Sequence, residues 1–140
     1  MKVLMLSKTF PAWHPRRGEP TGFAEKFLSG VKIHTLRENA KGYYKDGDVV
    51  SVRQWSGTPY NSPQEVIKDG VRIGVVNVSV VRQVDSDLIN VWLGRSIKMF
   101  QAETLAINDG LSVDDLAGWV FAGGKDKWNG FVIHFTDFRY

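Results

Sequence analysis

The chain contains no cysteine among its 140 residues. A disulfide framework, a thiolate nucleophile and a thiolate metal site are therefore excluded. A reducing cytoplasm is the simplest compartment for such a chain, so we expect a cytoplasmic protein. Long apolar runs are also missing. Residues 1–8 are too short for a signal-peptide core or a membrane span, and no later stretch approaches membrane length, so we expect no membrane partner.

The chain also lacks a large excess of charge of one sign. The 18 Lys and Arg residues oppose 15 Asp and Glu residues, which leaves a formal net charge of +3. This small excess is compatible with nucleic acid as a partner but does not require one. The three histidines, His14, His34 and His134, do not have the spacing of a metal site. The sequence therefore predicts no metal and no cofactor.

Hydrophobic residues, in contrast, are plentiful. They make up 43% of the chain, which carries five Trp, eight Phe and four Tyr. This supply is ample for a packed core, and the length suits one domain. We therefore expect a single folded domain over residues 1–140.

Hydrophobic periodicity and turn residues predict the order of the elements. The predicted strands cover residues 2–6, 33–37, 48–55, 71–84 and 131–140, and residues 85–99 are ambiguous, with a possible strand at 89–93. The predicted helices cover residues 21–29, 101–108 and 112–122, with Thr21 as the first N-cap and a capping box formed by Ser112 and Asp115. The predicted loops cover residues 9–20 and 56–63, and Asp69-Gly70 is predicted to be a tight turn. This order is typical of an α+β fold in which a mixed barrel carries peripheral helices.

The most informative stretch runs from Gly30 to Arg37 and reads Gly-Val-Lys-Ile-His-Thr-Leu-Arg. Lys32 and Arg37 flank the hydroxyl of Thr35, and Gly30 allows a tight turn in front of them. Side chains two residues apart on a strand share a face, so Thr35 and Arg37 are expected to point the same way. Such a cluster can hold a phosphate or polarise a carbonyl oxygen.

The pattern Gly-x-Lys-x-x-Thr-x-Arg resembles the signature of ASCH domains, which are PUA-like β-barrels. Residues 47–50, 55–60, 106–111 and 131–135 also resemble bacterial and phage members in their order and spacing. The resemblance implies a PUA-like mixed β-barrel with a few peripheral helices. It also implies a cleft for RNA or a nucleotide, lined by Lys32, Thr35 and Arg37 with Gly30 at the turn before them.

One branch of this family hydrolyses N(4)-acetylcytidine with a Lys, a Thr and a Glu as proton acceptor, nucleophile and proton donor. The resemblance carries the first two roles onto Lys32 and Thr35, and it aligns Asn77 with the Glu. Asn cannot exchange a proton as a carboxylic acid does, so an amidohydrolase here needs another acid. The alternative acids, which serve only if the fold brings them near, are Glu38, Glu65 and Glu103. Other relatives are ribonucleases.

The motif residues also have ordinary structural interpretations. Lys32 and Arg37 can be solvated charges beside a surface strand. Thr35 can be a β-branched strand residue whose hydroxyl bonds the backbone. A Thr hydroxyl becomes a nucleophile only when a base takes its proton, and Lys32 would have to be neutral to act as that base.

Two loops add candidate ligand-binding residues. Trp13 stands beside Arg16 and Arg17 in the first loop, and stacking combined with phosphate contact is a common way to hold single-stranded RNA. Trp55 and Tyr60 belong to the second loop and are candidates for stacking on a base. The alternative is that the first loop is a mobile basic segment. The remaining tryptophans, Trp92, Trp119 and Trp128, are assigned to packing.

Three functions therefore follow from the sequence. The favoured one is an RNA- or nucleotide-binding domain with a basic cleft around the motif, which would take RNA or a modified nucleoside or nucleotide. The alternative is an amidohydrolase-like or ribonuclease enzyme that uses Lys32 and Thr35. The third is a protein-interaction domain without a nucleic-acid role, which the modest charge permits.

Overall fold

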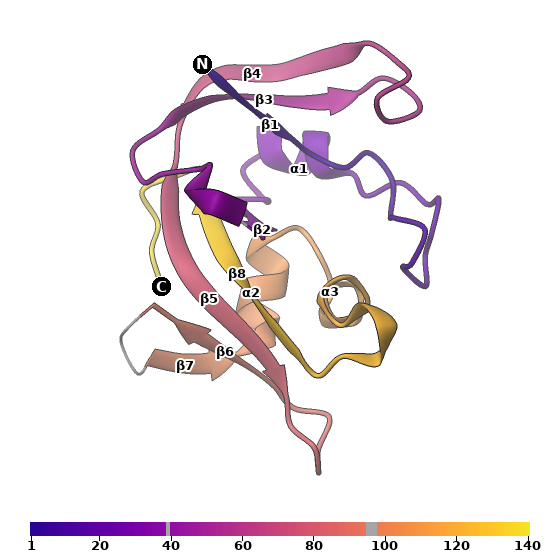
Figure 1. Ribbon diagram of the computed structural model, residues 1–140, viewed down its shortest axis with the longest axis vertical. Helices are drawn as coiled ribbons and strands as arrows, with labels where there is room; N and C mark the ends of the chain where they lie inside the picture. The colour runs from indigo at the N-terminus through magenta and orange to yellow at the C-terminus, as the bar shows by residue number, and fades with distance from the viewer. Residues whose placement is uncertain (39, 95–97) are drawn as a thin grey trace.

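The computed structural model describes residues 1–38, 40–94 and 98–140 (Figure 1). Within these ranges the chain forms an α+β fold with two short 3₁₀ turns, Ala40–Gly42 and Ala122–Gly124. The strands are β1 (Lys2–Met5), β2 (His34–Arg37), β3 (Val49–Trp55), β4 (Gln64–Arg72), β5 (Gly74–Arg82), β6 (Ile89–Leu93), β7 (Lys98–Gln101) and β8 (Lys127–His134). The helices are α1 (Phe23–Leu28), α2 (Ala102–Asn108) and α3 (Val113–Val120).

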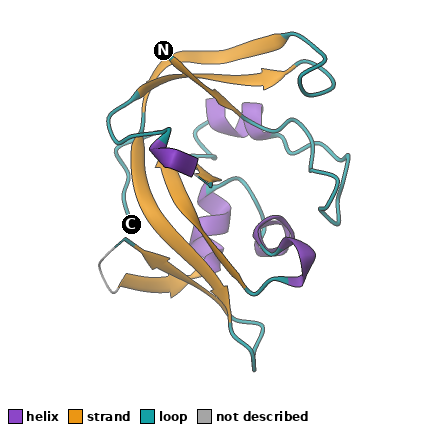
Figure 2. Ribbon diagram, viewed as in Figure 1, coloured by secondary structure: helices purple, strands orange, loops and turns teal. Residues whose placement is uncertain are grey.

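The strands form two sheets, with the orders β1-β3-β4 and β2-β8-β5-β6-β7 (Figure 2). Strand β1 lies parallel to β3, whereas β2 and β8 are antiparallel. Ile73 alone separates β4 from β5, so one bend of the chain joins the two sheets. The predicted α+β class is confirmed. Across the described residues, however, the two sheets do not join into the closed barrel that was expected.

Of the two predicted helix N-caps, Ser112 is confirmed, whereas Thr21 lies one residue before the N-cap that the structure shows. The hydroxyl of Thr21 accepts a hydrogen bond from the backbone N–H of Phe23 at 3.2 Å, although the N-cap position itself is Gly22. The hydroxyl of Ser112 accepts from the backbone N–H of Asp115 at 3.1 Å, which confirms the predicted N-cap of α3. Each bond satisfies a donor that the first turn of a helix leaves without a partner.

The tight turn predicted at Asp69-Gly70 is wrong, because β4 runs through both residues. Strand β3 pairs Val50 with Val71 and Val52 with Lys68, so one residue of β3 faces two residues of β4. Gly70 has a φ of 72°, which suits the left-handed residue of a bulge. The Asp-Gly pair therefore marks a β-bulge and not a hairpin.

Two predicted strand boundaries are also wrong. The strand predicted over residues 71–84 is divided at Ile73 between β4 and β5, and the strand predicted over residues 131–140 leaves the sheet after His134. Aromatic residues alternate beyond β8 without forming a strand. Phe138 and Tyr140 instead pack on each other, with ring centroids 5.0 Å apart. Of the ambiguous segment 85–99, residues 89–93 form β6, and residues 95–97 lie outside the described residues.

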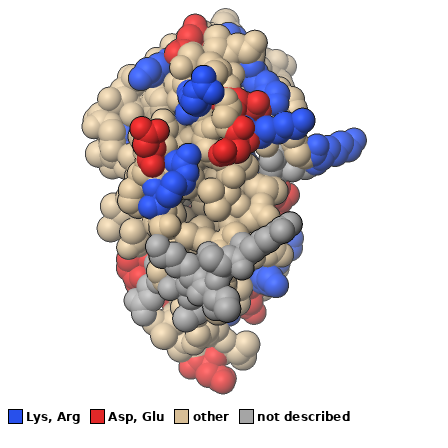
Figure 3. Space-filling view, turned by 90° about the vertical axis from the view of Figure 1, so that its left-hand side faces the viewer, with Lys and Arg blue, Asp and Glu red and all other residues tan. Residues whose placement is uncertain are grey.

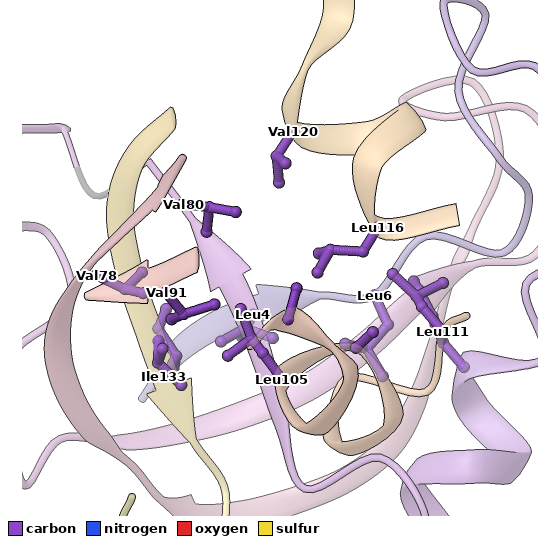
Figure 4. Packing of buried hydrophobic residues seen from close by; sticks show 14 of the residues in the cluster. Leu4, Leu6, Val78, Val80, Val91, Leu105, Leu111, Leu116, Val120 and Ile133 are labelled. Carbon is purple, nitrogen blue, oxygen red and sulfur yellow. The ribbon is translucent and has the colours of Figure 1, made fainter. Parts of the chain in front are cut away.

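The core lies between the sheets and the helices α2 and α3 (Figure 4). The converging side chains labelled there are Leu4, Leu6, Val78, Val80, Val91, Leu105, Leu111, Leu116, Val120 and Ile133. Val78, Val80 and Val91 are buried, whereas Asn77, which precedes Val78, and Trp92, which follows Val91, are exposed. Because strand side chains alternate between faces, this part of the five-stranded sheet has an inner face in the core and an outer face toward solvent.

Charged side chains of both signs are interspersed over the upper part of the face drawn in Figure 3. The mixture agrees with the small net charge of the chain. No helix within the described ranges is long and apolar enough to cross a membrane.

Candidate functional site

A cavity of about 350 Å³ is lined by residues of β2, α3 and the loop that carries Trp13. Its polar lining residues are Thr35, Arg37, Glu38, Asp109 and Lys125. Its aromatic lining residues are Trp13, Phe23, Trp119 and Trp128, and the rest of the lining is aliphatic. The fold thus brings three of the predicted site residues, Trp13, Thr35 and Arg37, to one hollow.

Arg37 is held rigidly at this cavity. Its Nη1 donates hydrogen bonds to Thr35 Oγ1 and to the carbonyl oxygen of Leu36, both at 2.9 Å. Its Nη2 donates to the carbonyl oxygen of Met5 on β1. Burial lowers the pKa of Arg37, and the nearby carboxylate of Asp109 acts in the opposite direction. The prediction that Thr35 and Arg37 share one face of a strand is confirmed.

Lys32 is not a solvated charge, since its side chain is completely buried. Its Nζ donates to the carbonyl oxygen of Asp109 at 2.8 Å, lies 3.3 Å from Asp109 Oδ1, and stands 4.0 Å from the ring centroid of Phe23. Burial lowers the pKa of Lys32 to about 8, although Asp109 opposes this shift. Phe23 and Asp109 line the cavity, so Lys32 lies behind its wall as a buried cation.

Asp109 is the residue that sequence reasoning missed. It follows α2 directly, and its Oδ1 faces both Lys32 Nζ and His34 Nδ1, the latter at 3.1 Å. His34 Nε2 in turn bonds the hydroxyl of Tyr140, to which the amide of Asn108 donates at 3.1 Å. In the sequence, Asp109 belongs to the segment 106–111 that shares the family resemblance and to an Asp-Gly pair after a helix, which is usually associated with a turn, and neither signal indicates a partner for Lys32.

The three candidate acids and Asn77 lie in different parts of the fold, and they differ in whether they line the cavity. Glu38 lines the same cavity as Thr35. Asn77 lines a different hollow, on the exposed side of β5. Glu65 lies on β4, where Gln54 donates to it at 2.9 Å, and Glu103 is an exposed residue of α2. Glu38 and Asp109 are therefore the carboxylates that line the cavity among the described residues.

Two tryptophans that were assigned to packing also form cavity walls. Trp119 of α3 stacks on Phe23, with ring centroids 5.7 Å apart and planes inclined by 30°. Trp128 lies over Gly130, since a Cβ added there would be 2.3 Å from the indole ring. Both rings are half-buried, so each one packs on the core and presents a surface to the cavity.

The loop that carries Trp13 is fixed to α3 by His14. The backbone N–H of Arg16 donates to His14 Nδ1 at 3.0 Å, so Nε2 carries the proton and donates to the carbonyl oxygen of Asp115 at 2.9 Å. A Cβ added at Gly118 would be 2.8 Å from this Nε2, so the close approach requires glycine. Trp13 itself stays 60% exposed at the cavity.

Four other predicted ligand-binding residues lie away from the cavity lining. Arg16 pairs with Asp115, and Arg17 is exposed. Trp55, the last residue of β3, packs on Tyr60 of the loop between β3 and β4, with ring centroids 5.1 Å apart. Gly30 has a φ of 82°, which confirms its role as the turn that precedes Lys32.

His134 is a buried histidine next to this network. Its ring meets the ring of His34 edge to face, with centroids 5.6 Å apart, and its Nδ1 has no hydrogen-bond partner within the described residues. Burial, followed by the neighbouring His34, lowers the pKa of His134 to about 4. His134 is therefore neutral near pH 7.

The lowered pKa of His134 predicts that the folded protein loses stability in acid. As the pH falls from about 6.5 toward 4, the unfolded imidazole binds a proton that the folded protein excludes, so the free energy of unfolding decreases. Urea unfolding at about pH 7 and about pH 5 should show a smaller acid loss for His134→Gln than for the wild type. An identical acid loss in both proteins would contradict the assignment.

We compared the chain with models of known protein families, with characterised proteins and with solved structures, and none of these comparisons gave a match. The ASCH resemblance therefore rests on the sequence alone, on the motif at residues 30–37 and the four shorter segments that accompany it.

Proposed function

We propose that this protein is an RNA- or nucleotide-binding domain of the ASCH type, and that its two open sheets are a variant of the PUA-like barrel. In this proposal the cavity holds one nucleobase. The observation that carries the proposal is the set of three tryptophans, Trp13, Trp119 and Trp128, around the hydroxyl of Thr35 and the guanidinium of Arg37.

The size and lining of the cavity suit a flat aromatic ligand. Its volume of about 350 Å³ is at the lower end of the range for small-molecule sites, which are mostly apolar with a few fixed polar groups. Every nucleobase has a face that stacks on an indole ring, and each such contact contributes about 1–3 kcal/mol. The exposed Trp13 can close over a base that enters against Trp119 and Trp128.

Arg37 supplies a fixed cation for the same ligand. Its bonds to the described residues use three of the five N–H donors of the guanidinium, which leaves donors for a base carbonyl or a phosphate. The cation does not need to be ordered when the ligand arrives, because the bonds to Thr35 and Met5 already fix it. Lys125 adds a second positive charge to the lining.

The proposal is tested by titrating labelled single-stranded RNA of mixed sequence at about 50 mM and about 200 mM salt. We expect saturable binding that weakens at the higher salt, and Trp13→Ala should weaken it by about tenfold or more. Tyr60→Ala removes an exposed aromatic ring outside the cavity and serves as the matched control. No saturable binding, or full affinity in Trp13→Ala, would refute the proposal.

A second candidate is the amidohydrolase-like or ribonuclease activity at Thr35. The observations that favour it are the carboxylates of Asp109 and Glu38, which line the same cavity as Thr35, and the pKa of about 8 for Lys32 behind the cavity wall. Asp109 and Glu38 supply the acid that Asn77 lacks. Incubation with N(4)-acetylcytidine should then release cytidine, faster as the pH rises toward 8, and Thr35→Val should abolish the release. Failure of the wild type to release cytidine would exclude this reaction.

A further inference from the structure

A second hollow, of about 600 Å³, lies on the outer face of the five-stranded sheet. It is formed by cross-strand neighbours. Trp92 of β6, Ser79 of β5 and Asn129 of β8 stand side by side in one row, and Asn77 pairs with Phe131 in the next row. The sheet register therefore brings two aromatic rings, two amides and a hydroxyl to one surface.

The polar groups of this second hollow are ordered by the sheet itself. The Ser79 hydroxyl lies 2.6 Å from Asn129 Oδ1, which it can donate to, and this bond holds the amide in place. Trp92 is 39% exposed, and β6 and β5 fix its backbone through the pair with Ser79. Such a surface offers a ring to stack on and amide groups to bond a base edge, which is how single-stranded bases are commonly recognised.

The second hollow adjoins the cavity described above. Glu38 lines both of them. Arg37, which lines the cavity, stands in register with Phe131, which lines the second hollow. Between them lies Gly130, over which the ring of Trp128 reaches toward the cavity. A ligand that extends out of the cavity past Glu38 therefore arrives at Phe131 and Asn77.

We propose that this second hollow is a subsite for the base of a neighbouring nucleotide, so that the ligand is a single strand of two or more nucleotides and not a free nucleoside. This inference rests on the proposed function, because it assumes that the first base occupies the tryptophan-walled cavity. Stacking on Trp92 and Phe131 and hydrogen bonds from Asn77 and Asn129 hold the second base.

The charge of the second hollow distinguishes it from a phosphate site. Glu38 is the charged side chain among its described lining residues. Recognition there depends on stacking and amide hydrogen bonds, which release no counterions. Loss of this subsite should therefore weaken the binding of oligonucleotides without changing the slope of affinity against salt concentration.

The test compares the affinities of a nucleoside monophosphate, the corresponding dinucleotide and a tetranucleotide for the full chain. The wild type should bind the dinucleotide at least about tenfold more tightly than the monophosphate, since the second base adds a stacking contact. Trp92→Ala should remove this gain, leave the affinity for the monophosphate unchanged and keep the salt dependence. Trp92→Phe retains a ring and should retain most of the gain.

Equal affinities of the wild type for the monophosphate and the dinucleotide would overturn the subsite, and so would an unchanged gain in Trp92→Ala. Asn77→Leu is a second variant at an exposed position, and it should also reduce the gain in affinity. It replaces Trp92→Ala in the test if that variant does not fold. Binding of none of the three ligands would instead overturn the proposed function and the subsite with it. The two failures are thus distinguished by whether the monophosphate binds.

Discussion

Replacing Asp109 with Ala is expected to lower the free energy of unfolding by about 3–5 kcal/mol, because it leaves the buried Lys32 ammonium without a counter-charge. The side chain of Lys32 is 0% exposed, so water cannot replace the carboxylate. His34 also loses the partner of its Nδ1, which adds to the cost. Urea unfolding followed by tryptophan fluorescence measures the effect.

The loss in Asp109→Ala should shrink as the pH rises toward 8. Asp109 raises the pKa of Lys32, so its removal lowers that pKa further below the wild-type value of about 8. Between the lowered pKa and about 8, the folded variant has released the Lys32 proton that the folded wild type still holds, so the difference in stability between the two proteins decreases over this range and stays constant above it. Asp114→Ala, at an exposed position of α3, is the control. A variant of Asp109 within about 1 kcal/mol of the wild type would contradict the buried ion pair.

Gly130→Ala is expected to destabilise the protein by about 1–3 kcal/mol and to weaken nucleotide binding together with it. The added Cβ would lie 2.3 Å from the ring of Trp128 and 2.7 Å from the carbonyl oxygen of Arg37. The indole can turn away, but the carbonyl belongs to the backbone of β2, so the strand must shift. Both movements displace walls of the cavity.

The matched control for Gly130→Ala is Gly57→Ala. Gly57 has no positive φ, and an added Cβ would meet its nearest neighbour, Ser62, at an ordinary distance of 3.5 Å. We therefore expect stability and binding close to those of the wild type. Thermal unfolding and the RNA titration on both variants make the comparison, and a Gly130→Ala protein that matches Gly57→Ala would refute the steric argument.

The parts of the fold that the sequence predicted correctly depend on local chemistry. The cap at Ser112 and the shared face of Thr35 and Arg37 need only residues a few positions apart. The failures depend on pairing with a distant strand. Asp69-Gly70 has the composition of a turn, and only the register against β3 makes it a bulge.

The candidate site divides in the same way. The motif identified Lys32, Thr35 and Arg37, but spacing cannot show that Lys32 turns inward to a carboxylate 77 residues later in the chain. Trp119 and Trp128 have the composition of core residues, and their second role as cavity walls follows from the packing of α3 and β8 around β2. The rule that a buried lysine needs an acid nearby leads to Asp109 once the structure shows that Lys32 is buried.

The bond from Arg37 to the carbonyl oxygen of Met5 ties the strand at the cavity to the first strand of the other sheet. A ligand that pulls the guanidinium of Arg37 toward the cavity would weaken its hydrogen bond to Met5. A ligand that binds beside the guanidinium without moving it would leave this hydrogen bond in place. We therefore expect ligand binding in the cavity to change amide hydrogen exchange along Lys2–Met5.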